Sequence, residues 1–405
     1  MEYPKLRYVD TFPIEHEGNK YVCLRDPQDT NGNMLLVAPQ AIYVISYFTG
    51  GNSIVDIQLK LLKEYGELVE KEHIAQLAQQ LDDAFLLDSD KYRNHQQQLE
   101  DDFKKSEIRL PSHAGLSYPN EPDELTKWID GYFSNGTNPS SNGKKTVGII
   151  SPHIDFSRGG SSYAKAYNEL INNEHCDTFI IFGTSHYASV ENPFILSKKN
   201  YKTPYGEAEV DLDLIDRIES SCEWDLYEGE IFHKSEHSIE FQVVFLQYLF
   251  GGKREFKILP ILCNSFYRFI ESGTSPSEDH RTASFLNCIK EIVTGLGNRA
   301  VVIAGADLAH MGNKFGDAEA VNDSTLEWIK NRDYWSIKHS AELDNEAFYR
   351  SVEEEKDKRK ICGLSPIYAL LSVINAKKGE MLDYGQAVEP DTGSVVTYTS
   401  MGFYS

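Results

Sequence analysis

The stretch TVGIISPHIDF (residues 146–156) joins an apolar run of strand length to a histidine and a carboxylate. Three further runs share this length and apolar character: DTFIIFG (177–183), FKILPIL (256–262) and AVVIAGA (300–306). Continuous apolar runs of this kind, separated by helical segments, are typical of parallel strands buried on both faces. The sequence therefore predicts an α/β fold with a mostly parallel central sheet flanked by helices.

Polar or titratable side chains stand directly after three of these four runs. In α/β sheets ligands bind at the carboxyl ends of the strands, so we expect these side chains to gather at one edge. A helix start, EHSIE (236–240), adds polar groups that can line the same site. The side chains concerned are His153, Asp155, Ser185, His186, Glu236, His237, Glu240, Asp307 and His310.

The histidines of this set point to a metal site. A single histidine near a strand end is usually a structural residue bonded to the backbone, but four at one edge are harder to explain in that way. Imidazole suits iron, copper, zinc and nickel, and a ligating histidine commonly donates its other N–H to a carboxylate. The residues predict a mononuclear metal site without selecting the metal. The candidate carboxylate partners are Asp155, Glu236, Glu240 and Asp307.

Other chemistries have less support. There is no G-x-S-x-G elbow for a serine hydrolase, and no Walker or dinucleotide fingerprint. The glycine-rich SRGGSS (157–162) opens a helix, so Arg158 and free N–H groups there are candidates to hold a carboxylate or phosphate. The candidate substrate-binding residues are Arg158, Asp155, Glu236, Glu240 and Ser185.

The composition is that of an acidic globular protein. The chain has 405 residues, 40% of them apolar, and a formal net charge of −22. That charge argues against a nucleic acid or an anionic membrane as a partner. No apolar run reaches the roughly 18 residues of a membrane span, and the N-terminus has no signal-peptide pattern. The six cysteines form no C-x-x-C pair, which favours a reduced, cytoplasmic protein.

The N-terminal part is predicted to form a separate, winged-helix-like α+β domain. Two segments, YVCLRD (21–26) and MLLVAP (34–39), predict strands around the turn PQDTNGN (27–33). Three short helices are predicted to follow, the second capped by Ser53. The predicted boundaries are 1–92 for this domain, 93–106 for a charged linker helix and 107–405 for the α/β domain, with a polar loop at 134–145.

Segments of this first domain resemble the PqqD-like domains. FTGGNSIVDI (48–57) and LDDAFLLDS (81–89) carry the resemblance, together with the dipeptide Asp26-Pro27. PqqD-like domains are small peptide-recognition modules found near radical-SAM and peptide-modification enzymes. The resemblance implies a peptide or protein partner for residues 1–92. The alternative that the residues leave open is a packing or dimerisation domain.

The chain from residue 107 onwards carries eight motifs: RLPSHAGLSYP, SPHIDFSRGG, GTSHY, TPYGEAEVD, EHSIEFQVVFL, GADLAHMG, CGLSPI and LDYGQAVEPDTGSVVTYTSMGF. In this order and spacing they closely resemble the Memo family, which includes the proteins called AmmeMemoRadiSam system protein B. The resemblance implies a fold similar to class III extradiol dioxygenases and a bound iron or copper ion. On that basis His153 and His186 would be metal ligands, and His237 would line the same pocket. The family name alone implies a radical-SAM partner.

One position departs from the family pattern. The animal Memo protein resembled here has a cysteine ligand directly before the histidine of its D-[LF]-x-H motif, whereas this chain has Ala309, which cannot bind a metal. The resemblance then leaves His237, or else Asp307 or His310, as the third ligand. Cys263, which ends the third apolar run, is not at the matching position.

The leading hypothesis is a metal-dependent redox enzyme, such as an oxygenase, that holds Fe(II) or copper through His153, His186 and His237. His310, oriented by Asp307, would act as the general acid or base. One alternative is a non-catalytic protein that binds a peptide or a phosphorylated ligand in the same cleft. The other is a zinc hydrolase that activates a water molecule.

Overall fold

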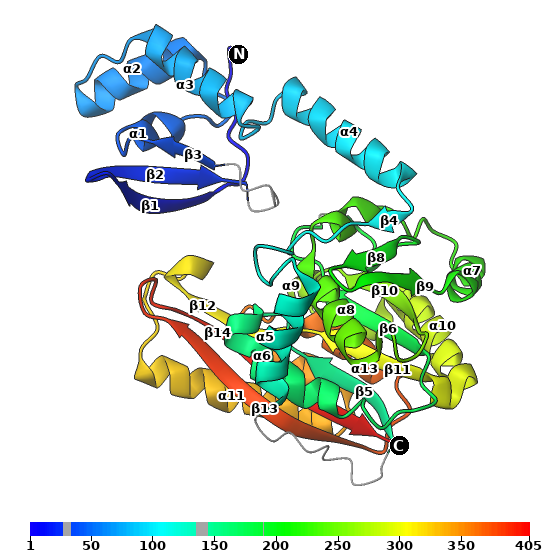
Figure 1. The fold of residues 1–405 in the computed structure, drawn as a ribbon. Coiled ribbons are helices and arrows are strands. Elements are labelled where there is room, and N and C mark those ends of the chain that lie inside the picture. The colour runs from blue at the N-terminus through cyan, green and yellow to red at the C-terminus, as the bar shows by residue number, and fades with distance from the viewer. Residues whose placement is uncertain (27–33, 135–144, 189) are drawn as a thin grey trace. The chain divides into compact units, whose positions relative to one another are not determined.

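The computed structural model describes the whole chain apart from residues 27–33, 135–144 and 189. Two compact units make up the chain, Met1–Ser106 and Glu107–Ser405 (Figure 1). Each unit has its own cluster of buried apolar side chains. The turn predicted at PQDTNGN and nearly all of the predicted polar loop lie outside the described residues.

The first unit combines a three-stranded antiparallel sheet, in the order β1-β2-β3, with helices. Helix α2 begins at a capping box, in which Ser53 accepts from the N–H of Asp56 and the Asp56 carboxylate accepts from the N–H of Ser53. Strand β1 was not predicted, because it is largely exposed and contains Pro13, which only an edge strand tolerates. The elements are β1 (Asp10–His16), β2 (Asn19–Arg25), β3 (Met34–Val37), α1 (Ala41–Ile45), α2 (Ile54–Tyr65), α3 (Lys71–Asp83) and α4 (Asp90–Lys105).

The second unit is built on a sheet with a parallel centre. Strands β5 (Thr146–Ser151), β11 (Ala300–Gly305), β6 (Thr178–Thr184) and β10 (Lys257–Cys263) lie side by side in that order and run parallel. They correspond to the four apolar runs, so the predicted α/β fold with a mostly parallel sheet is confirmed. Every residue of β6 and β11 is buried, as expected for strands covered on both faces.

Shorter and antiparallel strands complete this sheet on both sides. On one side β14 (Ser394–Tyr404) pairs along its whole length with β13 (Lys378–Glu389), while its first residues pair with β12 (Asp307–Gly312) and its last residues pair with β5. All of these contacts of β14 are antiparallel. The strands on the other side are β7 (Phe194–Leu196), β9 (Gly206–Val210), β8 (Asn200–Thr203) and β4 (Ile108–Arg109).

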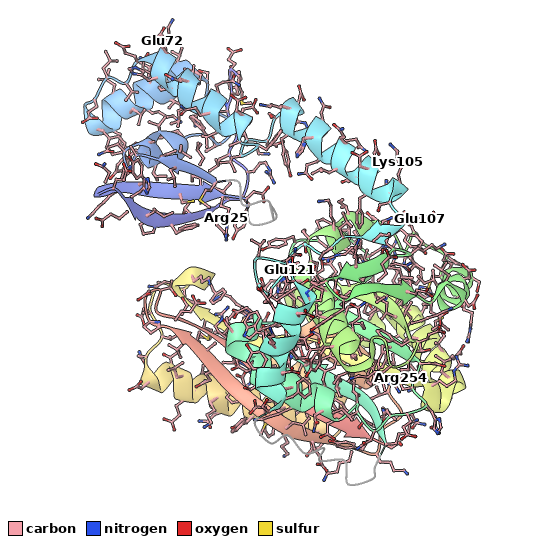
Figure 2. The ribbon with its side chains drawn as sticks, in the orientation of Figure 1. Arg25, Glu72, Lys105, Glu107, Glu121 and Arg254 are labelled. Atoms are coloured by element: carbon pink, nitrogen blue, oxygen red, sulfur yellow. The ribbon has the colours of Figure 1, made fainter. Side chains whose placement is uncertain are left out.

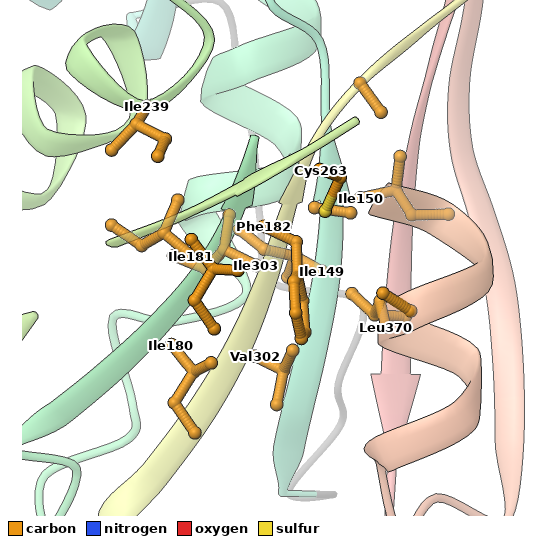
Figure 3. Close-up of a cluster of buried hydrophobic side chains, with 14 of the residues drawn as sticks. Ile149, Ile150, Ile180, Ile181, Phe182, Ile239, Cys263, Val302, Ile303 and Leu370 are labelled. Atoms are coloured by element: carbon orange, nitrogen blue, oxygen red, sulfur yellow. The ribbon is translucent and has the colours of Figure 1, made fainter. Parts of the chain in front are cut away.

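Helices cover both faces of the sheet. Helix α8 (His237–Phe250) and α13 (Leu364–Val373) lie on opposite faces of the central strands, as Ile239 and Leu370 show in Figure 3. Helix α6 (Phe156–Asn168) packs beside α8, and α5 (Pro122–Phe133) packs on α6. The remaining helices of four residues or more are α7 (Leu212–Ser221), α9 (Tyr267–Ser272), α10 (His280–Leu296), α11 (Asp323–Ala341), α12 (Asn345–Glu353) and the short 3-10 helix η1 (Glu230–Lys234).

Two glycines bring the start of α8 directly onto the sheet. A Cβ atom at Gly183 in β6 would lie 2.5 Å from Cγ1 of Ile239, and one at Gly305 in β11 would lie 2.5 Å from the carbonyl oxygen of Ser238. Any larger side chain at either position would push the helix away. The first turn of α8 is therefore held at the carboxyl ends of two central strands, where the polar residues gather.

Charged side chains such as Glu72 and Lys105 of the first unit and Glu121 of the second are exposed and project away from the ribbon (Figure 2). The net charge is acidic because 62 aspartates and glutamates outnumber 40 lysines and arginines. In the part of the chain that the structure describes, no helix has both the length and the apolar character needed to cross a membrane.

Candidate metal centre

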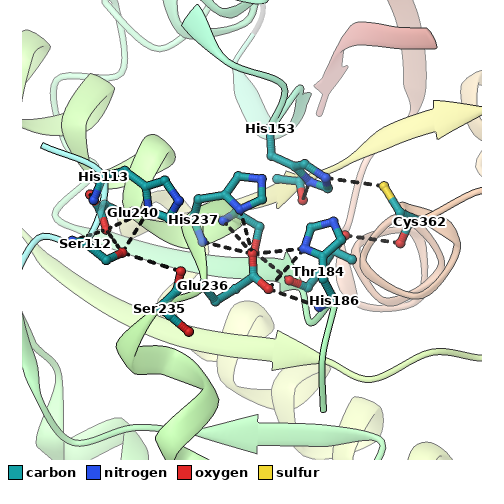
Figure 4. Close-up of polar contacts among 12 residues, drawn as sticks. Ser112, His113, His153, Thr184, His186, Ser235, Glu236, His237, Glu240 and Cys362 are labelled. Atoms are coloured by element: carbon teal, nitrogen blue, oxygen red, sulfur yellow. Dashed lines mark hydrogen bonds and ion pairs between the residues drawn. The ribbon is translucent and has the colours of Figure 1, made fainter. Parts of the chain in front are cut away.

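Three histidines converge at the carboxyl edge of the sheet (Figure 4). His153 comes two residues after β5, His186 comes two residues after β6, and His237 is the first residue of α8. One ring nitrogen from each lies within 4.8 Å of the others. The ring centroids are 4.9 Å apart for His153 and His186, 5.0 Å for His186 and His237, and 5.3 Å for His153 and His237.

Each of the three rings has an acceptor beside its Nδ1 atom. The Nδ1 of His153 lies 3.0 Å from the carbonyl oxygen of Gly305, and that of His186 lies 3.0 Å from Oε2 of Glu236. The Nδ1 of His237 lies 3.2 Å from the other oxygen, Oε1, of the same carboxylate. An Nδ1–H held in this way leaves a lone pair on Nε2, which is the neutral form in which imidazole binds a metal. The three rings therefore fit a metal ion.

The Glu236 carboxylate organises two of these rings and the helix that carries one of them. It accepts from the backbone N–H groups of His186, His237 and Ser238, and it is 4% exposed. Burial alone would raise its pKa, but the charges and hydrogen bonds of His186 and His237 outweigh burial and hold the pKa well below its usual range. The same carboxylate raises the pKa of His186 against the opposing effect of burial. Glu236 thus supplies one negative charge to the centre.

Asp307 lies beside His153, not beside His310. Its Oδ1 accepts from the backbone N–H of His153 at 3.0 Å, and its Oδ2 lies 3.7 Å from Nε2 of the same residue. The Nδ1 of His310 lies 3.0 Å from the carbonyl oxygen of Leu308, and burial lowers the pKa of His310 to about 3. The expected pairing of Asp307 with His310 is not found among the hydrogen bonds of the described residues, because backbone amides occupy the carboxylate.

Cys362 is a residue of the centre that the sequence reasoning missed. Its Sγ lies 3.3 Å from Nε2 of His153, and its backbone carbonyl accepts from the Thr184 hydroxyl at 3.1 Å. Burial raises the pKa of its thiol well above the usual value. The motif CGLSPI contains this cysteine, but nothing in the motif itself indicates that the thiol reaches His153. Only the fold brings Cys362, just before α13, to a strand end more than two hundred residues earlier in the chain.

Two of the predicted substrate-binding residues bond to each other. Asp155 caps α6 and accepts from the backbone N–H of Arg158, and the two side chains form an ion pair. The Arg158 guanidinium also pairs with Glu389 at 2.6 Å. The hydrogen bonds and ion pairs that the structure gives Asp155 do not include His153. The contacts of Asp155 and Arg158 stabilise the start of α6.

Glu240 is fully buried in α8 and fastens the segment before α5 to this helix. It pairs with Arg109 and accepts from the N–H groups of Ser112 and His113, as well as from the Tyr118 hydroxyl. Burial opposes ionisation, but Arg109 and the hydrogen bonds lower the pKa of Glu240 overall. The segment thereby brings the His113 ring to 5.3 Å from the His237 ring, on the side away from Cys362 (Figure 4).

Ser185 belongs to a cavity that opens beside the three histidines. The cavity has a volume of about 170 Å³, and both His186 and Cys362 line it. Ser185 itself is 7% exposed. The structure therefore brings together His153, His186, His237, Glu236 and Asp307, places Ser185 and His310 close by, and sets Asp155, Arg158 and Glu240 in supporting contacts.

The fold and the converging histidines define an α/β protein with a candidate mononuclear metal centre. Residues 109–402 match the family model described as Memo-like protein. The chain is 30% identical over 404 residues to a MEMO1 family protein of Aquifex aeolicus. The aligned residues make up 99% of this chain and 100% of that relative. This chain belongs to the Memo family, as the eight motifs predicted.

Shorter relatives match only part of the chain. A MEMO1 family protein of Methanosarcina acetivorans is 30% identical over 305 residues, which is 73% of this chain and 98% of the relative. The MEMO1 family protein MJ0403 of Methanocaldococcus jannaschii is 29% identical over 311 residues, again 73% of this chain and 98% of the relative. Members of the family thus occur at about the length of the second unit.

Proposed function

We propose that the chain binds a single transition-metal ion through His153, His186 and His237 and acts as a metal-dependent redox enzyme. The observation that carries this proposal is that an acceptor lies beside the Nδ1 of every ring, so that each Nε2 can carry the lone pair that binds a metal. The thiol of Cys362 adds a soft ligand type at the same place, and such ligands favour copper and iron over magnesium or calcium.

An iron or copper ion held here would supply one-electron redox chemistry, and iron would also supply reactivity toward dioxygen. The residues of the chain prepare the place for it. Glu236 fixes the orientation of two rings and balances positive charge, while Asp307 fixes the backbone at His153. His153 is 2% exposed, so bulk water has little access to its ring.

His310 is not suited to donate a proton near neutral pH, and its low pKa also makes it a weak base. With a pKa of about 3 its ring is neutral near neutral pH. A neutral imidazole has a lone pair that can act as a general base, whereas a general acid needs the protonated form. We therefore propose that His310 does not serve as the general acid of the centre.

The test is elemental analysis of protein purified without oxygen and then reconstituted separately with Fe(II), copper and zinc. We expect wild type to retain about one ion of iron or copper per chain, and the His153→Ala, His186→Ala and His237→Ala variants to lose it. His175→Ala is the matched control, because His175 is exposed and precedes β6, at the opposite end of that strand from His186. Reconstitution without retention of any metal would refute the proposal and leave a non-catalytic binding protein. Tight binding of zinc alone would favour a hydrolase.

A further inference from the structure

The cavity beside the three histidines is of the size of a small molecule. Its volume of about 170 Å³ is close to that of the ~150 Å³ cavities in proteins that take up benzene. It therefore has room for one six-membered ring with few substituents, but not for a peptide segment of several residues. His186 and Cys362 belong both to its wall and to the candidate metal centre, so a molecule inside it would lie against that centre.

The wall offers hydroxyl groups and a carboxyl group on an otherwise apolar surface. Ser185, Ser265, Ser365 and Asp357 are among the residues that line the cavity, and so is the apolar Phe266. The Oγ of Ser185 is buried and has no hydrogen-bond partner among the described residues. A buried hydroxyl without a partner is costly in a protein interior. A ligand that bonds to Ser185 would remove this cost.

The charge of the wall disfavours anions. Among the described residues that line the cavity there is no lysine or arginine, and the positive charge of His186, whose pKa is raised by Glu236, is balanced by that carboxylate at 3.0 Å. Its one acidic group, Asp357, is partly buried, and burial raises its pKa to about 6. One oxygen of this carboxylate accepts from the N–H of Ile361 at 2.8 Å. Sites for carboxylates and phosphates usually contain arginine or lysine, and here a carboxylate would repel them.

The segment that carries Asp357 is held in a strained conformation. Lys356, Asp357 and Lys360 have positive φ angles of 55°, 50° and 52°. Such conformations cost free energy and persist only where surrounding contacts enforce them. The buried Arg359 supplies these contacts, since it pairs with Asp333 and with Glu355. The position of the Asp357 carboxylate is thus fixed by the fold.

We propose that this cavity is the substrate site and that it takes a small molecule of about one ring that carries hydrogen-bond donors and no negative charge. Asp357 accepts from one donor group of the ligand, and Ser185 bonds to another polar group. Chemical conversion of this molecule rests on the proposed redox function. Its binding to the cavity does not depend on that function.

The test is calorimetric titration of the full-length, metal-free protein with four probes: resorcinol, α-resorcylate, the neutral primary amide of α-resorcylate, and toluene. Resorcinol is ring-sized, bears two donors and does not chelate metals. We expect resorcinol and the amide to bind at least tenfold more tightly than α-resorcylate, which has the size of the amide but is an anion. We expect toluene, which fits the cavity but lacks donors, to bind more weakly than resorcinol.

Two variants test the named groups. Asp357→Asn retains a residue type that tolerates positive φ. We expect this variant to bind resorcinol about tenfold more weakly and to show a smaller difference in affinity between α-resorcylate and its amide. Ser185→Ala should weaken resorcinol to a similar degree. Asp391→Asn, at an exposed aspartate, is the control.

Equal binding of α-resorcylate and its amide, or unchanged resorcinol affinity in Asp357→Asn, would overturn the proposal even if Ser185→Ala fails to fold. Metal retention without resorcinol binding would refute the cavity assignment and leave the redox function standing. Resorcinol binding without metal retention would support the cavity assignment and refute the redox function.

Discussion

At the scale of single residues, Glu236 connects more parts of the centre than any other side chain described above. One buried carboxylate caps α8, receives the backbone N–H of His186 and lies beside the Nδ1 atoms of two rings. Its charge and its geometry act together, because the oxygens that orient the rings also make them better electron donors. A substitution that removes the charge of Glu236 but keeps the shape of its side chain separates the effect of charge from the effect of geometry.

We expect Glu236→Gln to lower the affinity for the metal about 10–100-fold, which is the usual effect of losing a carboxylate behind a ligating histidine. The measurement is competition with a chelator of known affinity, at fixed pH. Glu207→Gln, at an exposed glutamate of β9, should leave the affinity unchanged. A Glu236→Gln protein with wild-type affinity would show that the charge is not needed.

His233 provides a residue-scale prediction about pH. The ring of this buried histidine lies between the Tyr201 hydroxyl at Nδ1 and the carbonyl oxygen of Ile195 at Nε2, and burial lowers its pKa from 6.5 to about 3. Between these values the unfolded chain binds a proton at this position and the folded chain does not. Acid therefore favours the unfolded state, and stability falls as the pH is lowered from 6.5 toward 3.

Each unit of pH in this interval should cost about 1.4 kcal/mol of unfolding free energy through this one residue. We expect His233→Gln, which cannot titrate, to lose stability less steeply than wild type. Urea unfolding of the metal-free protein at several pH values between neutral and about pH 4 measures both slopes. Parallel slopes in the two proteins would contradict the prediction.

At the scale of elements, the position of α8 on the sheet decides whether His237 and Glu236 reach the centre. Gly183 and Gly305 leave no room for a side chain beneath the first turn of the helix. Gly305 also provides the carbonyl that lies beside the Nδ1 of His153. A methyl group at Gly305 would therefore shift two of the three rings at once, and one at Gly183 would shift His237 together with α8.

We expect Gly305→Ala and Gly183→Ala each to destabilise the fold by about 1–3 kcal/mol, as overpacked cores do, and to weaken metal binding as well. The control is Gly295→Ala in α10, where a Cβ atom meets nothing within 4 Å and where alanine should be neutral or stabilise by up to about 1 kcal/mol. Thermal unfolding and metal affinity are measured on all three. Equal behaviour of the three variants would show that α8 does not need this close approach.

The elements also show what the sequence allows to be predicted. The continuous apolar runs of β5, β6, β10 and β11 identified the parallel centre, and the strand-end rule brought His153 and His186 to one edge. Strand β14 carries serine and threonine among its apolar residues, and β13 is largely half-exposed, so neither shows a period that reveals a strand. Cys362 lies between helices, and no local pattern indicates that it reaches His153.

At the scale of the whole molecule, the two units have separate cores. The first buries residues such as Ile57, Leu61 and Leu81, and the second buries the sheet and its covering helices. The matched family model begins at residue 109, and archaeal relatives have about the length of the second unit. The candidate centre lies entirely in Glu107–Ser405.

We expect a protein consisting of residues 107–405 to fold and to retain the metal with an affinity within about twofold of the full chain. Circular dichroism and thermal unfolding measure whether the shorter protein folds, and the chelator competition described above measures its affinity for the metal. The full-length protein under the same conditions is the reference. Loss of metal by a folded shorter protein would show that the first unit contributes to the centre.

The position of β14 has a consequence for how the protein is made. Residues 401–404 of this strand pair with β5 and residues 394–398 pair with β12, so β5 lacks one of its two neighbours until residues 401–404 have been synthesised. A domain that emerges from the ribosome from its N-terminus onward cannot close such a sheet early. His153, at the end of β5, is then presented on a completed sheet only after synthesis has passed residue 404. A nascent chain that stalls in β13 therefore carries His153 on a sheet in which β5 still lacks one of its neighbours.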